Sequence, residues 1–213
     1  LLHQLQPDST AYNVELTIRL RGDLQVVALQ HSLQEIVRRH AALRTAVTVI
    51  DGRPLQVVND RADLPIHFVD LSILPAAARE DEMLRLAGEE ASLPFDLVQG
   101  PLVRAALYRL AAAEHVLQVS AHHMAADEWA LGLLAQELAA LYAAHCRGKD
   151  SPLPPLPVQY ADYAAWERNW YAGERRALDL AYWREQVADA PALSLPTDRP
   201  RPALQSARGA TVE

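Results

Sequence analysis

Two apolar runs separated by only a few residues constrain this chain more than any other feature. Residues 102–110 (LVRAALYRL) and 115–121 (HVLQVSA) lie on either side of the short stretch Ala112–Glu114. Apolar runs of this length, bounded by a brief break, are typical of buried strands joined by a tight turn. The sequence therefore predicts a pair of adjacent antiparallel strands.

The segments before this pair predict both strands and helices. Residues 11–22 alternate apolar and polar side chains, as expected of a half-buried strand. Apolar residues then recur at helical spacing through residue 40, and Asp23 is the expected N-cap of that helix. The other elements expected here are a hairpin at 43–50 and 54–58 around a turn at Asp51-Gly52, a short strand at 65–71 and a helix at 75–91.

The segments after the pair are mainly helical. A strong helical pattern runs from Asp127 to about His145, and two more helices are expected at about 159–171 and 174–188. Strands and helices are mixed without strict alternation, which predicts an α+β or mixed α/β layer.

Two proline-rich stretches interrupt this helical half. The stretch 151–157 (SPLPPLP) is expected to be an extended connector, and 190–203 is expected to be a linker or crossover. Residues 210–213 alternate like the start of a strand, and the chain opens on Leu1-Leu2 without Met. We therefore expect it to be part of a longer polypeptide.

Composition excludes several kinds of partner. The chain has 213 residues, half of them hydrophobic, which is enough for one substantial core or for one lobe of a larger enzyme. Its formal net charge of -7 argues against nucleic acid and anionic membranes as partners. No apolar run approaches the roughly 20 residues of a spanning helix. Cys146 is the single cysteine, so a reducing, cytoplasmic location is expected.

The segment that carries chemistry is Ser120–Trp129 (SAHHMAADEW), where two adjacent histidines end a strand and Asp127 opens a helix. Neighbouring side chains of a strand point to opposite faces, so His123 shares a face with Leu117 and His122 does not. By itself, this pattern leaves several interpretations open. A metal site lacks an evident third ligand, either histidine can be structural, Asp127 is an expected N-cap, and Glu128 is a favourable first-turn acid.

The wider pattern resembles a known family. His122-His123-x-x-x-Asp127 resembles the HHxxxDG signature of the condensation domains of nonribosomal peptide synthetases, within the chloramphenicol acetyltransferase-like superfamily. Further segments resemble motifs of this family in the same order, over essentially the whole chain. They are Leu5–Asn13 (LQP…AYN), Arg39–Thr45 (RHAALRT), Phe95–Leu97 (FDL), Gly100–Arg104 (GPLVR) and Tyr160–Trp166 (YADYAAW).

The resemblance implies a fold and a domain organisation. The expected class is α/β, as an α+β two-layer sandwich with a mixed, mainly antiparallel sheet and helices packed on it. In the family two such lobes form a V, and the site lies in a tunnel between them. Residues 1–213 are then the N-terminal lobe, with its first motif and the whole C-terminal lobe missing. We expect the isolated chain to be inactive and to expose an apolar face that favours self-association.

The resemblance also implies a reaction and its partners. Condensation domains join a donor acyl thioester to an acceptor aminoacyl thioester through an amide bond, and each substrate is carried on the phosphopantetheine arm of a carrier protein. The expected partners are upstream and downstream peptidyl carrier proteins, the missing lobe and an adjacent adenylation domain. This scheme requires no metal and no cofactor bound by the lobe itself.

The roles of individual residues follow from the match to the signature. His123 is expected to be catalytic and to face the acceptor amine. His122 is a positioning residue, and Asp127 is expected to pair with Arg44, because a buried carboxylate needs a partner. Glu128 stands where the signature has Gly, and Glu128 and Trp129 are expected along the substrate channel, where the carboxylate binds the substrate ammonium or restricts entry.

Other functions stay open at this point. An epimerization domain shares the HHxxxD signature, although the Arg39–Thr45 segment matches condensation domains better. An ester-forming acyltransferase of the same superfamily is a second alternative. A non-catalytic carrier-docking module is the third, and Glu128 is the main feature that favours it.

Overall fold

The chain divides into two compact units, Leu1–Gln159 and Tyr160–Glu213. The computed structural model describes residue 6, residues 8–200 and residue 203, so the strand expected at 210–213 lies outside the described residues. No described helix is long and apolar enough to cross a membrane.

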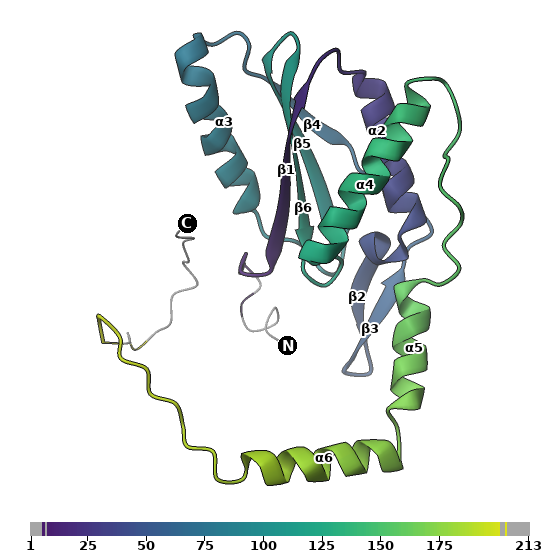
Figure 1. The fold of residues 1–213 in the computed structure, drawn as a ribbon, viewed down its shortest axis with the longest axis vertical. Helices are drawn as coiled ribbons and strands as arrows, with labels where there is room; N and C mark the ends of the chain where they lie inside the picture. Colours follow the sequence, from purple (N-terminus) through teal and green to yellow (C-terminus); the bar gives the residue numbers. More distant parts are fainter. Residues whose placement is uncertain (1–5, 7, 201–202, 204–213) are drawn as a thin grey trace. The chain divides into compact units, whose positions relative to one another are not determined.

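A four-stranded sheet forms the centre of the first unit (Figure 1). Its strands lie in the order β1 (Asn13–Arg21), β6 (Glu114–His122), β5 (Val103–Ala111) and β4 (Ile66–Asp70). β5 and β6 are antiparallel, as predicted, β1 is antiparallel to β6, and β4 is parallel to β5. The mixed, mainly antiparallel sheet is therefore confirmed, and β6 is held by strands on both sides.

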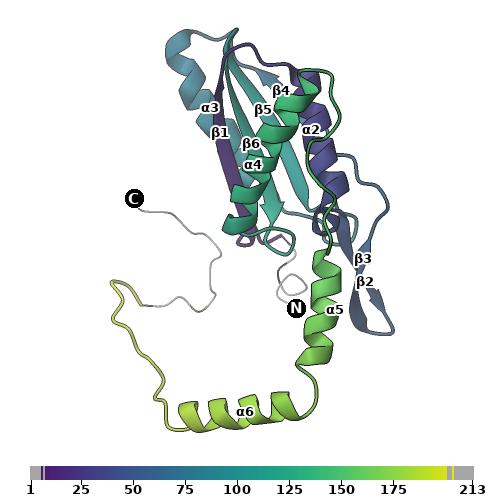
Figure 2. The ribbon, with the colours of Figure 1, turned by 45° about the vertical axis from the view of Figure 1, so that its right-hand side comes forward.

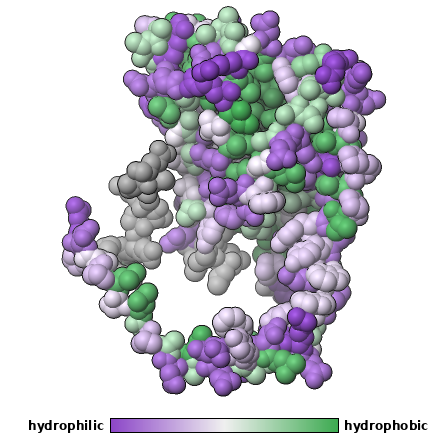
Figure 3. Space-filling view, viewed as in Figure 1, coloured by the Kyte–Doolittle hydropathy of each residue, from purple (hydrophilic) through white to green (hydrophobic). Residues whose placement is uncertain are grey.

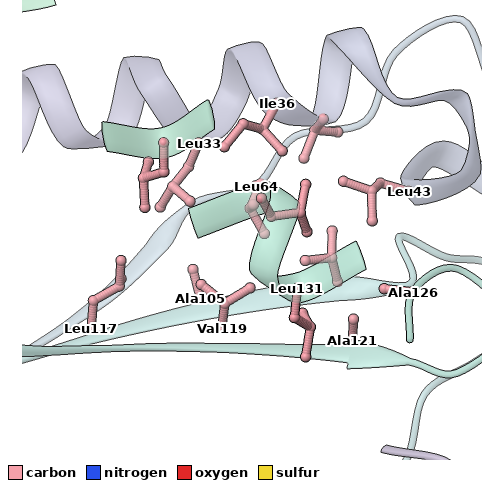
Figure 4. Close-up of a cluster of buried hydrophobic side chains, with 14 of the residues drawn as sticks. Leu33, Ile36, Leu43, Leu64, Ala105, Leu117, Val119, Ala121, Ala126 and Leu131 are labelled. Carbon is pink, nitrogen blue, oxygen red and sulfur yellow. The ribbon is translucent and has the colours of Figure 1, made fainter. Parts of the chain in front are cut away.

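Helices α2 (Val26–Arg39) and α4 (Glu128–His145) cover one face of this sheet (Figure 2). Because side chains alternate between the faces of a strand, every second residue of β6 points toward these helices. Leu117, Val119 and Ala121 are buried in the resulting core, where each fully buried leucine contributes about 2 kcal/mol. Figure 4 shows, from the helices that line this core, Leu33, Ile36 and Leu131.

Helix α3 (Ala76–Ala91) covers the opposite face of the sheet. Its Met83 packs against Tyr108 of β5. Gln118 of β6 is buried on this face, accepts a hydrogen bond from the Tyr108 hydroxyl (2.9 Å) and donates one to the Ala87 carbonyl (3.0 Å). The predicted α/β class is confirmed, and α3 adds a layer that the two-layer description did not include.

The predicted hairpin forms a separate two-stranded sheet, β2 (Thr45–Ile50) and β3 (Arg53–Val58). Its turn is Asp51-Gly52, with φ angles of 51° and 73°. A two-residue type I′ turn requires this left-handed region, which Gly adopts without strain. The first strand begins at Thr45 rather than at residue 43, because Ala41–Arg44 form a 3₁₀ turn.

The expected N-cap of α2 is wrong. The helix begins at Val26, its N-cap is Gln25, and no side chain caps it. The Gln25 amide instead donates a hydrogen bond to the Tyr142 hydroxyl of α4 (3.0 Å). A contact with another helix thus satisfies this amide, so the helix start does not use Asp23.

A buried carboxylate on α4 connects α2 to the proline-rich connector. Glu137 accepts hydrogen bonds from Arg39 Nε (3.0 Å) and His40 Nε2 (2.7 Å). Arg39 also donates to the Pro154 carbonyl. The connector at 151–157 has neither helix nor strand, as predicted. Because removing one partner of a buried ion pair is strongly destabilising, this cluster fixes the path of the connector over the first unit.

The second unit contains α5 (Tyr160–Trp170) and α6 (Glu174–Val187), which confirm the two helices predicted for this segment. Neither helix has a buried residue, and Figure 3 shows hydrophobic residues at the surface of α6 among hydrophilic ones. Residues 190–200 have neither helix nor strand, and the crossover expected at 190–203 stays a prediction. A row of exposed rings with centroids between 5.6 and 6.0 Å apart runs along α5 through Tyr160, Tyr163, Trp166 and Trp170.

The buried ring of His115 predicts a loss of stability in mild acid. His115 is 5% exposed, and its Nδ1 has no hydrogen-bond partner within the described part of the chain. Burial, with a contribution from Arg109, lowers the pKa of His115 below its usual value near 6.5. The unfolded chain therefore binds a proton at a higher pH than the folded chain. The contribution of neutral His115 to the free energy of unfolding is therefore complete above the unfolded-state pKa of about 6.5. It is lost as the pH falls from there through the lower pKa of the folded state.

The measurement is urea unfolding, followed by circular dichroism, at roughly pH 7.5 and 5.5. We expect His115→Leu to reduce the fall in unfolding free energy between the two values. The matched control is His67→Leu on β4, where the side chain is exposed, and it should leave the fall unchanged. An identical fall in the wild type and in His115→Leu would contradict the prediction.

Candidate active site at the end of strand β6

The two histidines lie where β6 ends. His122 is the last residue of the strand and is buried, whereas His123 follows it and is exposed. The neighbouring strands hold the backbone on both sides. The His122 amide donates to the Leu102 carbonyl (3.0 Å), and the His123 amide donates to the Tyr12 carbonyl (2.7 Å). The chain then turns, because the Ala125 amide donates to the His122 carbonyl (2.8 Å).

The strand alternation predicts opposite faces for the two rings, and the structure gives the surroundings of His122 in more detail than those of His123. His122 lies on the α3 side of the sheet, where its ring centroid is 6.1 Å from that of Phe95. His123 was expected to share the face of Leu117, which is buried in the core. Its side chain is exposed and regular strand structure ends one residue earlier, at His122, so the shared face stays a prediction. An exposed imidazole is accessible to a substrate, as catalysis requires.

A hydrogen bond to the His122 ring indicates which of its nitrogens is the acceptor. Its Nδ1 accepts a hydrogen bond from the Met124 amide (3.2 Å). An imidazole nitrogen accepts only when it carries no proton, so this contact places the proton of the neutral ring on Nε2. The rings of Phe95 and Tyr12 pack around His122, each with its centroid 6.1 Å away. His122 is therefore a packed, oriented residue that controls the turn after it.

Asp127 is the N-cap of α4, which agrees with one of the interpretations of the sequence. Its carboxylate accepts a hydrogen bond from the Ala130 amide (2.7 Å). Capping satisfies a backbone donor in the first turn, and the negative charge is favourable at the positive end of the helix dipole.

The predicted pairing of Asp127 with Arg44 does not occur. The Arg44 guanidinium donates to the backbone carbonyls of Val37, Arg38 and Asn59. These carbonyls belong to the end of α2 and the segment after β3, so Arg44 joins two parts of the backbone. Asp127 needs no buried cation, because it is exposed and its carboxylate is used as a cap.

Glu128 and Trp129 begin the exposed side of α4. Trp129 is 87% exposed, so its large apolar ring is available to a partner or a substrate. A shallow depression on this side is lined by Glu128, Trp129, Gly132, Leu133 and Gln136. The structure thus brings His123, Glu128 and Trp129 to the surface near the same strand end, but it does not test their predicted roles.

A further cavity in the first unit lies away from the histidines. It measures about 750 Å³, and of the predicted site residues only Arg44 lines it. Its walls carry both acidic and basic side chains, including Arg38, Asp60 and Lys149, so no ligand chemistry stands out. Among the described residues, no three His, Cys, Asp or Glu side chains are grouped to hold a metal ion.

Three residues near the histidines have contacts that the sequence did not predict. Tyr12, Phe95 and Arg104 each belong to a segment that resembles a family motif, and no role followed from the resemblance. Phe95 packs against His122, and the Arg104 guanidinium lies over the Phe95 ring, 3.8 Å from its centroid. The FDL and GPLVR segments were identified in the sequence as resembling family motifs. Because both lie far from the histidines along the chain, nothing in the sequence indicated these contacts.

Comparison with solved structures defines the class of fold. The X-domain from teicoplanin biosynthesis is 33% identical, with a TM-score of 0.82 over 93% of this chain and 44% of that chain. The starter condensation domain of the rhizomide synthetase RzmA is 24% identical, with a TM-score of 0.80 over 90% of this chain and 46% of that chain. The second similarity shows the fold alone. The fold is that of chloramphenicol acetyltransferase-like condensation domains.

The sequence comparisons give the family. The model of the condensation domain matches residues 1–213. A component of the linear gramicidin synthase of Brevibacillus parabrevis is 48% identical over 210 residues, which are 98% of this chain and 4% of that protein. Phosphinothricin tripeptide synthetase PhsC of Streptomyces viridochromogenes is 41% identical over 98% of this chain and 19% of that protein. The chain belongs to the condensation-domain family, whose members are in general acyltransferase-type enzymes.

The cap at Asp127 gives a prediction that separates capping from charge pairing. We expect Asp127→Ala to lower the free energy of unfolding by about 1 kcal/mol, because the Ala130 amide loses its acceptor. Asp127→Asn should lower it by only a fraction of that amount, because Asn caps about as well as Asp. Urea unfolding of the chain measures both. An equal loss in the two variants would show that the charge matters and not the cap.

Proposed function

We propose that this chain provides the histidine-bearing wall of a site in which two carrier-bound acyl groups are joined by an amide bond. The observation that carries the proposal is the exposed imidazole of His123, whose backbone amide is held by the Tyr12 carbonyl at the end of a central strand. Family membership supports the reaction class. The chain spans less than half of the solved chains that it matches, so the rest of the site is proposed to come from a second lobe.

The chemistry asks little of the histidine as a base. Imidazole has a reference pKa of about 6.5 and an α-amine one of about 7.7–8.0, so proton transfer from the ammonium is uphill by about 2 kcal/mol. Roughly a tenth of a free α-amine is already neutral at pH 7. The proposed role of His123 is therefore to accept a hydrogen bond from the acceptor amine and aim it at the donor thioester carbonyl. The bond from the amine nitrogen to that carbon forms and the carbon–sulfur bond breaks. The amine nitrogen loses one proton, which His123 relays to the departing thiolate, so that the products are the amide and the free thiol of the donor arm.

The substrates are proposed to arrive on the phosphopantetheine arms of upstream and downstream carrier proteins, with an adenylation domain beside the acceptor carrier. Membership of the condensation-domain family supports partners of this kind. No group bound by the lobe itself takes part in the scheme. His122 orients the turn from behind, and Asp127 caps the helix that follows it.

Replacing His123 tests the proposal directly. In the complete domain that contains this chain, we expect His123→Ala to lower kcat for amide formation about a hundredfold, because a misplaced nucleophile typically costs that much. The assay uses two loaded carrier proteins and detects the amide by mass. The matched control is His67→Ala, an exposed histidine on β4, with an unchanged rate. A His123→Ala rate within about threefold of the wild type would contradict the proposed role.

Two similar solved structures each favour an alternative function, which is a docking module in one case and an ester-forming enzyme in the other. A teicoplanin X-domain, 31% identical with a TM-score of 0.79, was solved as a complex with OxyB, which favours a docking module as the second candidate. SgcC5 from Streptomyces globisporus, 33% identical with a TM-score of 0.73, was solved with an aryl ethanediol and sucrose, and an alcohol in such a fold favours an ester-forming enzyme. The same assay separates these functions, since docking gives carrier binding without product and an ester former accepts a hydroxyl acceptor.

Replacing Glu128 tests whether this residue restricts the acceptor side of the proposed channel. If it restricts the acceptor side of the channel, Glu128→Gly should broaden acceptor use and change the rate severalfold, because Gly removes bulk and negative charge. The measurement is amide formation with acceptors of different size, in the complete domain. Gln136→Gly, on the same side of α4, controls for a weaker helix. An unchanged rate and acceptor range in Glu128→Gly would remove the proposed channel role.

A further inference from the structure

Backbone carbonyls in the turn after α3 accept several hydrogen bonds from Arg104. The guanidinium donates to the carbonyls of Glu90 (3.1 Å), Leu93 (2.9 Å) and Pro94 (3.2 Å), and it forms an ion pair with the Glu90 carboxylate (2.6 Å). The last carbonyls of a helix have no partner within it, and a basic side chain near the C-terminus can satisfy them. Arg104, on β5, therefore fixes the turn at 90–94 to the sheet.

The same guanidinium begins a stack that leads to His122. Its carbon lies 3.8 Å from the centroid of the Phe95 ring, which is a close cation–π contact. Phe95 is 4% exposed, and its ring is nearly perpendicular to that of His122, at 81° and 6.1 Å. This edge-to-face arrangement is favourable for aromatic pairs. Arg104, Phe95 and His122 thus pack in series on one side of the sheet.

A second route leads from the same turn to His123. The Asn13 side-chain amide donates to the carbonyls of Ala91 (2.7 Å) and Leu93 (2.9 Å). The residue before it, Tyr12, accepts the His123 amide with its carbonyl (2.7 Å). The Leu93 carbonyl therefore receives donors from both routes. One reaches the ring of His122 through Phe95, and the other reaches the backbone of His123.

The two routes meet in the turn that presents His123. The Met124 amide donates to Nδ1 of His122 only while that nitrogen carries no proton. Rotation of the ring, or a proton on Nδ1, would break this hydrogen bond. The turn at residues 122–125 would then lose one of the contacts that order it. The Phe95 ring packs against that of His122, as the Tyr12 ring also does, and the Arg104 guanidinium packs over Phe95.

We propose that Arg104 and Phe95 are positioning residues of this site: their stack holds His122 as the tautomer with its proton on Nε2, and this tautomer holds the turn that presents His123. The proposal rests on the proposed function for the task of His123. The test of this proposal does not measure turnover. The positioning proposal can therefore fail while the proposed function stands, and the proposed function can fail while the positioning proposal stands.

The wild-type chain gives the first test. Proton-detected ¹⁵N spectra of the 213-residue chain, labelled at histidine, distinguish a nitrogen that carries a proton from one that does not. We expect Nδ1 of His122 to carry no proton and Nε2 to carry one, at neutral pH. A proton on Nδ1 in the folded wild type would overturn the proposal without any variant.

Two variants give the second test. Phe95→Leu removes the ring, and Arg104→Lys keeps the charge but loses the planar, multiple hydrogen bonds. In each we expect a mixture of His122 tautomers. We also expect amide exchange of His123 and Met124 to accelerate about tenfold more than that of Leu117 and Val119, as the loss of one such contact predicts. The β6 amides report loss of stability in the whole unit, so the difference isolates the turn.

The control is Arg175→Lys, because Arg175 lies 3.9 Å over the Trp170 ring in the second unit. This variant changes the same kind of contact away from the histidines, and His122 should keep its wild-type tautomer. If Phe95→Leu does not fold, Arg104→Lys decides. Equal acceleration at all four amides, with one unchanged tautomer, would reduce Arg104 and Phe95 to ordinary structural residues and overturn the proposal.

Discussion

The placement of strand β6 between β1 and β5 determines the rest of this structure. A strand with hydrogen-bonded neighbours on both sides has a fixed register, because a slip by one residue would move every side chain to the wrong face. Leu117 and Val119 then face α2 and α4, and Gln118 faces α3. The histidines follow at a point that two neighbouring strands have already fixed. A side chain on such a scaffold needs little further ordering to act on a substrate.

The sequence predicted this frame because its signals are local. The alternation at 11–22, the helical spacing of α4 and the turn at Asp51-Gly52 each lie within one element, where backbone geometry alone dictates the pattern. Asp127 was also predictable as a cap, since capping involves only the residues of the first turn. The same local pattern placed the histidines at the end of a strand, and β6 ends at His122.

The parts that sequence could not predict depend on contacts between distant segments. Arg44 was expected beside Asp127, yet three backbone carbonyls occupy its guanidinium. Asp23 was expected as an N-cap, yet a tyrosine hydroxyl on α4 satisfies the start of α2. In both cases the sequence indicated a group that requires a hydrogen-bond partner, but the predicted partner was wrong. Arginine side chains and free backbone amides must be hydrogen-bonded, and the tertiary fold determines which group provides the hydrogen bond.

Two polar clusters, on different sides of the sheet, complete the first unit. Glu137 with Arg39 and His40 fixes the connector beside α2 and α4. Arg104 with Glu90 fixes the turn that supports Phe95 and, through it, His122. Buried or half-buried charges of this kind persist only when their hydrogen bonds are satisfied, so each cluster allows one arrangement of the segments it joins. The first cluster joins the connector to α2 and α4 of the first unit, and the second supports the proposed site.

The ring of His123, rather than that of His122, is proposed to meet the acceptor amine. An experimental structure of the complete domain with an acceptor analogue tethered at its phosphopantetheine arm tests this assignment most directly. We expect the amine nitrogen within about 3.2 Å of a His123 ring nitrogen, which is hydrogen-bond reach. An amine bound to His122, or one beyond the reach of His123 even through a single water, would contradict it.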